Sequence, residues 1–218
     1  MTDTQLVERT MTFIQKTQQG AEAGHDWFHI QRVYRNTLLI SKNEKVDLLV
    51  VRLAALLHDI ADAKFHGGDE SIGPKIAREF LTDLGVAENV IQHVVNIILN
   101  ISYKSSLGPK NSFTSKELEV VQDADRLDAM GAIGIARAFN YGGFRNRGLY
   151  DPDVPPNTKM TKEQYKNSNA PTLNHFYEKL LLLKDKMNTD TGKILAGERH
   201  RFMLDYLDHF YREWNGEV

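Results

Sequence analysis

Apolar residues recur every three to four positions along most of the chain, which is the spacing of one face of an α-helix. No stretch alternates apolar and polar residues for long, as a half-buried strand would. We therefore predict an all-α fold, with a first helix around Leu6 to Ile14. Further helices are predicted over residues 26–41, 46–62, 73–85, 88–102, 114–139, 171–187 and 192–214. The helix over 46–62 is apolar nearly all round and should be buried.

Several residues mark where these helices begin and end. Asp26 stands at an N-cap position, where its carboxylate can accept hydrogen bonds from the free N–H groups of the first turn. Pro74 near the start of its helix and Gly85 just past its end are residue types favoured at those positions. Thr114 and Glu117 have the spacing of a capping box. These local signals support the helical interpretation independently of the apolar pattern.

One segment, residues 141–171, departs from the helical pattern and holds four of the six prolines of the chain. A connection of this length in a helical domain is typical of a functional loop or of a disordered one. Two interpretations stay open: a lid or partner surface, which its aromatic residues and arginines favour, and a linker between two helical halves. We expect a single domain over 1–218, with C-terminal helices over 172–215.

The composition limits the classes of function. Hydrophobic residues make up 41% of the chain and charged residues 26%, which is ordinary for a globular protein. The net charge of −2 argues against a nucleic-acid-binding protein that neutralises many phosphates. The absence of cysteine excludes disulfides, thiolate metal sites and cysteine nucleophiles. No signal peptide and no membrane-spanning apolar run are recognisable, so we expect a cytoplasmic protein without a membrane partner.

A histidine and an aspartate, His58 and Asp59, come near the end of the most apolar predicted helix. An ionised carboxylate in such surroundings is costly unless it is paired or binds a cation. Arg52 lies about two turns earlier on the helix and offers a competing explanation, an ion pair with Asp59. From this stretch alone, a metal site and an ion pair both stay open.

A second group of acidic residues, Asp123, Asp125 and Asp128, interrupts an otherwise apolar helix. Asp125 and Asp128 are three residues apart and project from one helix face. A run of aspartates on a solvent-exposed face is the alternative, but the neighbouring residues are apolar. These neighbours are Val120, Val121, Leu127, Met130 and Ile133.

Together, His29, the pair His58–Asp59, and Asp125 in the context ADRLDA resemble the metal-binding pattern of the HD-domain phosphohydrolase superfamily. This resemblance covers roughly residues 20–140. The stretches HDWFHIQRV, LLHDIADAKF, YGG and HFYEKL are similar to a bacterial branch of HD-domain hydrolases, over most of the chain. The resemblance implies an HD-type helical bundle in which those four residues bind one divalent cation. It leaves the other His-Asp pair, at 25–26, without a metal role.

A site of two imidazoles and two carboxylates suits Mn²⁺, which we expect, or Fe, Co, Ni or Zn, and suits Mg less well. The resemblance implies a metal-dependent phosphohydrolase acting on a small-molecule nucleotide. We expect a (deoxy)nucleoside triphosphate pyrophosphohydrolase, which releases the monophosphate and pyrophosphate. Alternatives are a 5′-nucleotidase, an alarmone hydrolase, a non-catalytic nucleotide-binding HD module, or a structural helical domain. The base, the sugar and the oligomeric state, including a homodimer, stay open.

Proton transfer and charge neutralisation require further residues. Asp62 lies four residues after His58 on the same predicted helix, so it should orient or deprotonate the attacking water; a surface carboxylate at the helix end is the alternative. Phosphoryl transfer needs cations that stabilise the developing charge. We assign Lys64 to catalysis and Arg32, Lys104, Asp128 and Arg137 to substrate binding.

Overall fold

The computed structural model describes residues 1–18, 26–61, 69, 71–101, 113–161, 164 and 168–218. In these ranges the regular elements are all helices, which confirms the all-α prediction. The chain forms two compact units, Met1–Asp125 and Arg126–Val218. The single domain over 1–218 stays a prediction. Within the same ranges, no helix has both the length and the apolar character needed to cross a membrane.

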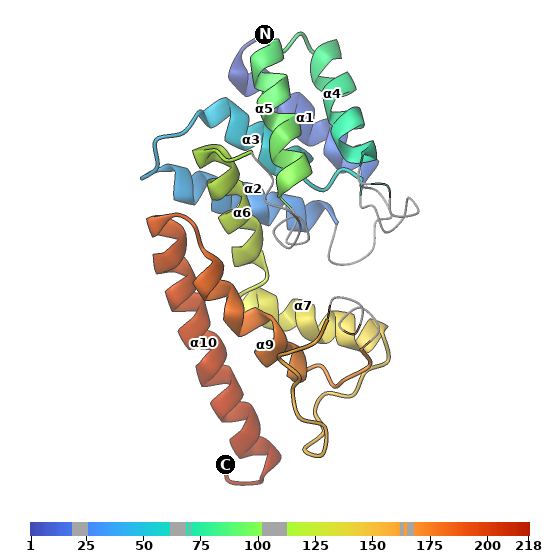
Figure 1. Cartoon of the computed structure of the whole chain (residues 1–218), viewed down its shortest axis with the longest axis vertical. Helices are drawn as coiled ribbons and strands as arrows, with labels where there is room; N and C mark the ends of the chain where they lie inside the picture. Colours follow the sequence, from blue (N-terminus) through green and yellow to red (C-terminus); the bar gives the residue numbers. More distant parts are fainter. Residues whose placement is uncertain (19–25, 62–68, 70, 102–112, 162–163, 165–167) are drawn as a thin grey trace. The chain divides into compact units, whose positions relative to one another are not determined.

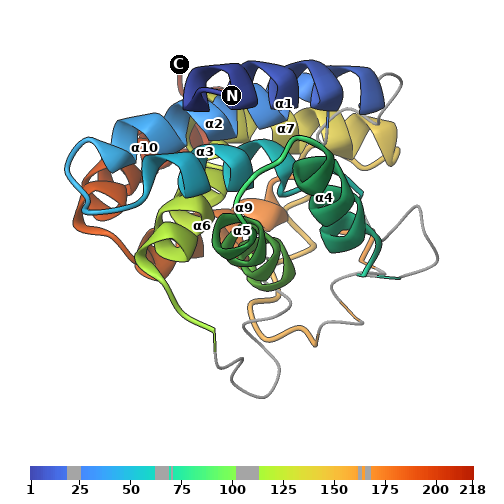
Figure 2. The same cartoon turned by 90° about the horizontal axis from the view of Figure 1, so that it is seen from above.

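The first unit contains helices α1 to α5 and most of α6 (Figure 1). Helix α3 runs through its middle and packs against α1, α2 and α5 (Figure 2). Most of α3 is fully buried, which confirms the prediction for this segment and follows from the favourable transfer of apolar side chains out of water. The bounds are α1 (Asp3–Thr17), α2 (Trp27–Ser41), α3 (Leu48–Leu57), α4 (Ile72–Asp83), α5 (Glu88–Asn100) and α6 (Lys116–Asp128).

Helix α3 is shorter than the predicted 46–62. It begins at Leu48 because the side chain of Asp47 accepts the N–H groups of Leu49 and Val50 as an N-cap. It ends at Leu57, and the next two residues lie in a turn. The expected continuation of this helix through position 59 was therefore wrong, and the His-Asp pair follows the helix rather than belonging to it.

Three of the predicted helix-end signals are confirmed, and one of them is Pro74, which lies in the first turn of α4. Asp26 is the N-cap of α2, and Gly85 follows α4 with a φ of +70°, a value that glycine adopts without strain. The predicted capping box of Thr114 and Glu117 is wrong. Ser115 caps α6 instead, since its hydroxyl accepts the N–H of Leu118 at 3.1 Å.

The predicted continuous helix over 114–139 is broken in two. Helix α6 ends at Asp128, and α7 (Gly131–Phe144) begins three residues later. Met130 has extended backbone, and Gly131, the first residue of α7, has a φ of +67°, which lies outside the right-handed helical region and prevents one helix from continuing through both segments. Because α7 continues to Phe144, the segment predicted to be irregular from 141 begins later than expected.

The second unit contains α7, α9 (Asn174–Glu178), a 3₁₀ helix η3 (Leu180–Lys186) and α10 (Asp190–Trp214). Helix α10 packs against α7 and η3 (Figure 1). The helix predicted over 171–187 is two short pieces, because Lys179 between them has a φ of −145° and leaves the helical region. Helix α10 begins two residues before the predicted 192, since Thr189 caps it by accepting the N–H of Gly192.

Candidate metal centre

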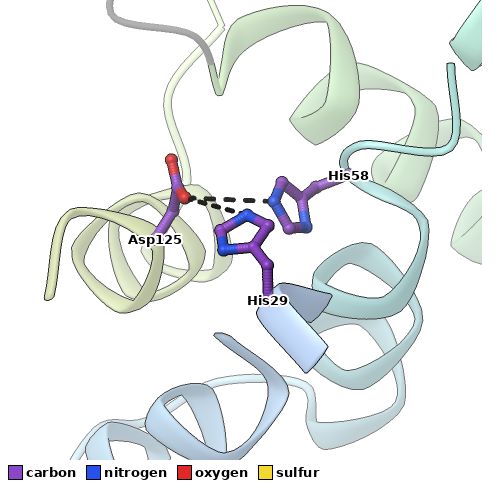
Figure 3. A group of neighbouring side chains, drawn as sticks. All are labelled: His29, His58 and Asp125. Carbon is purple, nitrogen blue, oxygen red and sulfur yellow. Dashed lines mark ion pairs between the residues drawn. The ribbon is translucent and has the colours of Figure 1, made fainter. Parts of the chain in front are cut away.

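Three side chains from distant parts of the first unit converge at one point. His29, His58 and Asp125 each offer one donor atom, and these atoms all lie within 4.8 Å of one another. Figure 3 shows the two imidazoles and the carboxylate turned toward each other from the start of α2, the turn after α3, and α6. Asp125 Oδ1 lies 3.6 Å from His29 Nε2 and 4.0 Å from His58 Nε2. The structure thus brings together three of the four predicted ligands.

His29 is positioned by the start of α2. The carboxylate of Asp26 accepts the backbone N–H of His29 at 2.9 Å, so the cap holds the backbone of this residue. The His29 residue is buried, with 2% of its surface exposed. Its position on the first helical turn follows from the local cap signal, and burial then restricts the ring to few orientations.

His58 is held by a hydrogen bond to the last turn of helix α3, which it follows. Its Nδ1 lies 2.8 Å from the carbonyl oxygen of Ala55, which is a distance of a hydrogen bond. A carbonyl oxygen can only accept, so in the neutral ring Nδ1 carries the proton and Nε2 carries the lone pair. The atom that faces Asp125 is therefore the one able to bind a cation, and this arrangement is common among metal-binding histidines.

The spacing of the donors fits a bound cation better than direct hydrogen bonds. Separations of 3.6 and 4.0 Å between nitrogen and oxygen are too long for hydrogen bonds. Bonds from a transition metal to nitrogen or oxygen are about 2.0–2.2 Å long, so the donor atoms of two ligands of one ion lie at most about 4.4 Å apart. Both separations fall below that limit, and the donors, two imidazole nitrogens and a carboxylate oxygen, are those such ions prefer.

Asp59, the fourth predicted ligand, lies in the turn after His58 and is half-buried. Its carboxylate is not part of the group of three donor side chains that converge among the described residues. Its backbone carbonyl accepts a hydrogen bond from Gln18 Nε2 at 2.8 Å, which ties the turn to the end of α1. Its role as a ligand stays a prediction.

The remaining predicted residues are placed as follows. Asp62, Lys64 and Lys104 lie outside the described residues. Arg32 is half-buried on α2, one turn after His29. Asp128 is buried and paired with Arg137, whose guanidinium approaches the carboxylate to 2.6 Å and also donates to the Asp128 carbonyl.

Two amide side chains that lie near the predicted ligands were not identified from the sequence. Gln18 donates to the carbonyl of Asp59, and Asn36 donates to the carbonyl of Ala124 at 3.1 Å. The position of Gln18 at the end of its helix carries no distinguishing signal. Asn36 could have been noticed, because it is a polar residue on the apolar face of its helix, seven positions after His29.

Comparisons with known proteins agree with this geometry. The model of the HD domain family matches residues 27–130, which include all three converging side chains. YpgQ of Bacillus subtilis is 35% identical over 218 residues, covering 99% of this chain and 97% of the relative. The chain belongs to the HD-domain family. HD domains bind divalent metals, and the three donors described above are suited to that task.

Solved structures extend the likeness over nearly the whole chain. The crystal structure of an HD-superfamily hydrolase from Bacillus thuringiensis has a TM-score of 0.79 and 42% identity, covering 98% of this chain and 99% of that one. The crystal structure of Bacillus subtilis YpgQ in complex with ADP has a TM-score of 0.76 and 37% identity, covering 98% and 97%. The protein is thus an HD-superfamily hydrolase.

Proposed function

We propose that this HD-superfamily hydrolase is a divalent-metal-dependent phosphohydrolase that converts (deoxy)nucleoside triphosphates into monophosphates and pyrophosphate. The observation that carries the proposal is the convergence of His29, His58 and Asp125 at separations suited to a shared cation. The ADP complex of YpgQ, a relative over nearly the full length of both chains, supports a nucleotide as the substrate.

His29, His58 and Asp125 would hold the cation, with Asp59 as a fourth ligand. Mn²⁺ is the expected ion, because two nitrogen donors disfavour Mg²⁺ relative to transition metals. When bound, such an ion polarises a phosphate group and lowers the pKa of a coordinated water. The bond from His58 Nδ1 to Ala55 keeps the proton away from Nε2 and fixes the direction of the ring.

In the proposed reaction, the oxygen of a water molecule bonds to the α-phosphorus, and the bond from that phosphorus to the oxygen bridging the α- and β-phosphates breaks. Pyrophosphate leaves with the bridging oxygen. Asp62 is proposed to accept the proton of the water, and Lys64 to offset the charge that develops on the phosphates. Arg32, Lys104, Asp128 and Arg137 stay predicted substrate-binding residues, and Arg32 has the support of its position one turn from His29. The cytoplasm stays the predicted compartment.

A substrate panel tests the proposal. The purified protein is incubated with Mn²⁺ and nucleoside mono-, di- and triphosphates, and phosphate and pyrophosphate are measured separately. We expect pyrophosphate from triphosphates, and no product from the Asp125→Ala variant. Asp26→Ala is the matched control, because it perturbs the same site without removing a donor. Release of phosphate from monophosphates alone would establish a nucleotidase, and turnover by Asp125→Ala equal to that of the wild type would refute the proposed metal centre.

A further inference from the structure

Asn36 is an amide side chain placed in the core of the first unit. The residue is 8% exposed, and its neighbours on the buried face of α2 include Val33 and Ile40, both fully buried. Burying an amide is unfavourable unless its polar atoms find hydrogen-bond partners. A hydrogen-bond partner of Asn36 from a distant part of the sequence therefore indicates why an amide occupies this position.

That partner is the backbone that carries a proposed metal ligand. Asn36 Nδ2 donates to the carbonyl oxygen of Ala124 at 3.1 Å, across 88 residues of sequence. The carbonyl of Ala124 belongs to the same planar peptide as the backbone nitrogen of Asp125. The Asn36 amide thus binds the peptide group that joins Ala124 to Asp125.

The same helix supplies the facing ligand. Asn36 follows His29 by seven residues, which is two helical turns, so both side chains project from one face of α2. His29 faces the carboxylate of Asp125, while Asn36 binds the backbone just before Asp125. Residues of helix α2 therefore lie against both the side chain of Asp125 and the backbone just before it.

We propose that Asn36 is a positioning residue of the metal centre, which keeps Asp125 within reach of a cation bound by the two histidines. This inference rests on the proposed metal site. The donor atoms of two ligands of one ion lie at most about 4.4 Å apart, and the observed separations are 3.6 and 4.0 Å. A shift of α6 by a few tenths of an ångström would take one donor beyond that limit.

A matched pair of variants separates positioning from general stability. Asn174 is also a buried asparagine, and its Nδ2 donates to the carbonyl of Val154 at 2.9 Å, but it belongs to the second unit. Asn36→Leu and Asn174→Leu therefore each remove a hydrogen bond from a buried side-chain amide to a backbone carbonyl. Both should lower the melting temperature of the metal-free protein, whereas only Asn36→Leu should weaken Mn²⁺ binding, by about tenfold, the lower end of the effect of residues that orient metal ligands.

Binding is measured by Mn²⁺ titration at a temperature where circular dichroism shows both variants folded, and the visible absorption of bound Co²⁺ reports the ligand arrangement. We expect an altered Co²⁺ spectrum in Asn36→Leu and a wild-type spectrum in Asn174→Leu. If Asn36→Leu does not fold, Asn36→Ser replaces it, because a serine hydroxyl can bond within its own helix but is too short to reach α6.

The outcomes distinguish this inference from the proposed function. Wild-type affinity and spectrum in the Asn36 variant would overturn the positioning role and leave the metal centre intact. Equal weakening in both variants would also overturn it, since the effect would then follow from stability alone. A wild-type protein that binds neither Mn²⁺ nor Co²⁺ would overturn the metal centre itself, and the role of Asn36 with it.

Discussion

Replacing Asp26 by alanine should lower the stability of the protein and largely preserve metal binding, whereas replacing His29 by alanine should do the reverse. The two residues are only three positions apart at the start of α2. The Asp26 carboxylate accepts the backbone N–H of His29 at 2.9 Å, and the imidazole of His29 lies 3.6 Å from Asp125 Oδ1. One substitution therefore removes a cap, and the other removes a proposed donor.

The expected magnitudes differ enough to be measured. Loss of an N-cap costs about 0.5–2 kcal/mol, and each kcal/mol corresponds to about 2–4 °C in the melting temperature of a chain of this size. Even if a loss of about 1 kcal/mol appeared wholly in metal binding, the Kd would rise only about fivefold. Removing residues that merely orient ligands costs about 10–100-fold in affinity, so removing the His29 donor should cost more than about 100-fold.

Thermal melts with chelator and with Mn²⁺, followed by Mn²⁺ titration, test both halves of this prediction. With chelator, Asp26→Ala should melt several degrees below the wild type. With Mn²⁺, Asp26→Ala should recover most of the wild-type stabilisation, and His29→Ala should show almost none. Loss of the metal in Asp26→Ala together with its retention in His29→Ala would refute this assignment of the two residues.

Three further predictions concern other residues. Asp59→Ala and Asp125→Ala should each abolish metal retention with unchanged circular dichroism; full metal occupancy in either would remove that carboxylate from the coordination sphere. Burial and two neighbouring cations lower the pKa of His175 to about 3. Because the folded protein disfavours the protonated ring, the free energy of unfolding is unaffected by this residue above pH 6.5 and falls as the pH drops from 6.5 toward 3. The loss reaches up to about 2 kcal/mol at pH 5. In urea unfolding, the free energy of unfolding should therefore fall less between pH 7 and pH 5 in His175→Gln than in the wild type. Equal losses in the two proteins would contradict this prediction. Arg137→Met should lower the free energy of unfolding by about 3 kcal/mol, because it leaves the buried carboxylate of Asp128 without its ion pair to Arg137. A wild-type melting temperature together with a raised KM would instead support a role of Arg137 in substrate binding.

The parts of the fold that could be predicted from the sequence are marked by residue types within a short stretch of the chain. The cap at Asp26 and the glycine after α4 each involve residues only a few positions apart. The burial of α3 involves distant helices, but the apolar residues on all of its faces predicted it. The break between α6 and α7 was missed because small and apolar residues continue the helical spacing through Gly131. Glycine is compatible with both a helix and a left-handed turn, so the pattern did not distinguish them.

Both histidines and Asp125 were predicted from the sequence to be ligands because they match a family pattern, and the structure places their donor atoms together. The hydrogen bonds that position these three residues were not predicted. Asn36 and Gln18 both donate to backbone carbonyls, and Ala55 accepts from His58 through the same kind of group. A carbonyl is present at every residue, so no residue type marks the acceptor, and only the fold determines which one an amide reaches. Residue identity therefore indicates which atoms of this chain are suited to bind a metal, while the precision of the proposed site depends on hydrogen bonds that a sequence pattern does not contain.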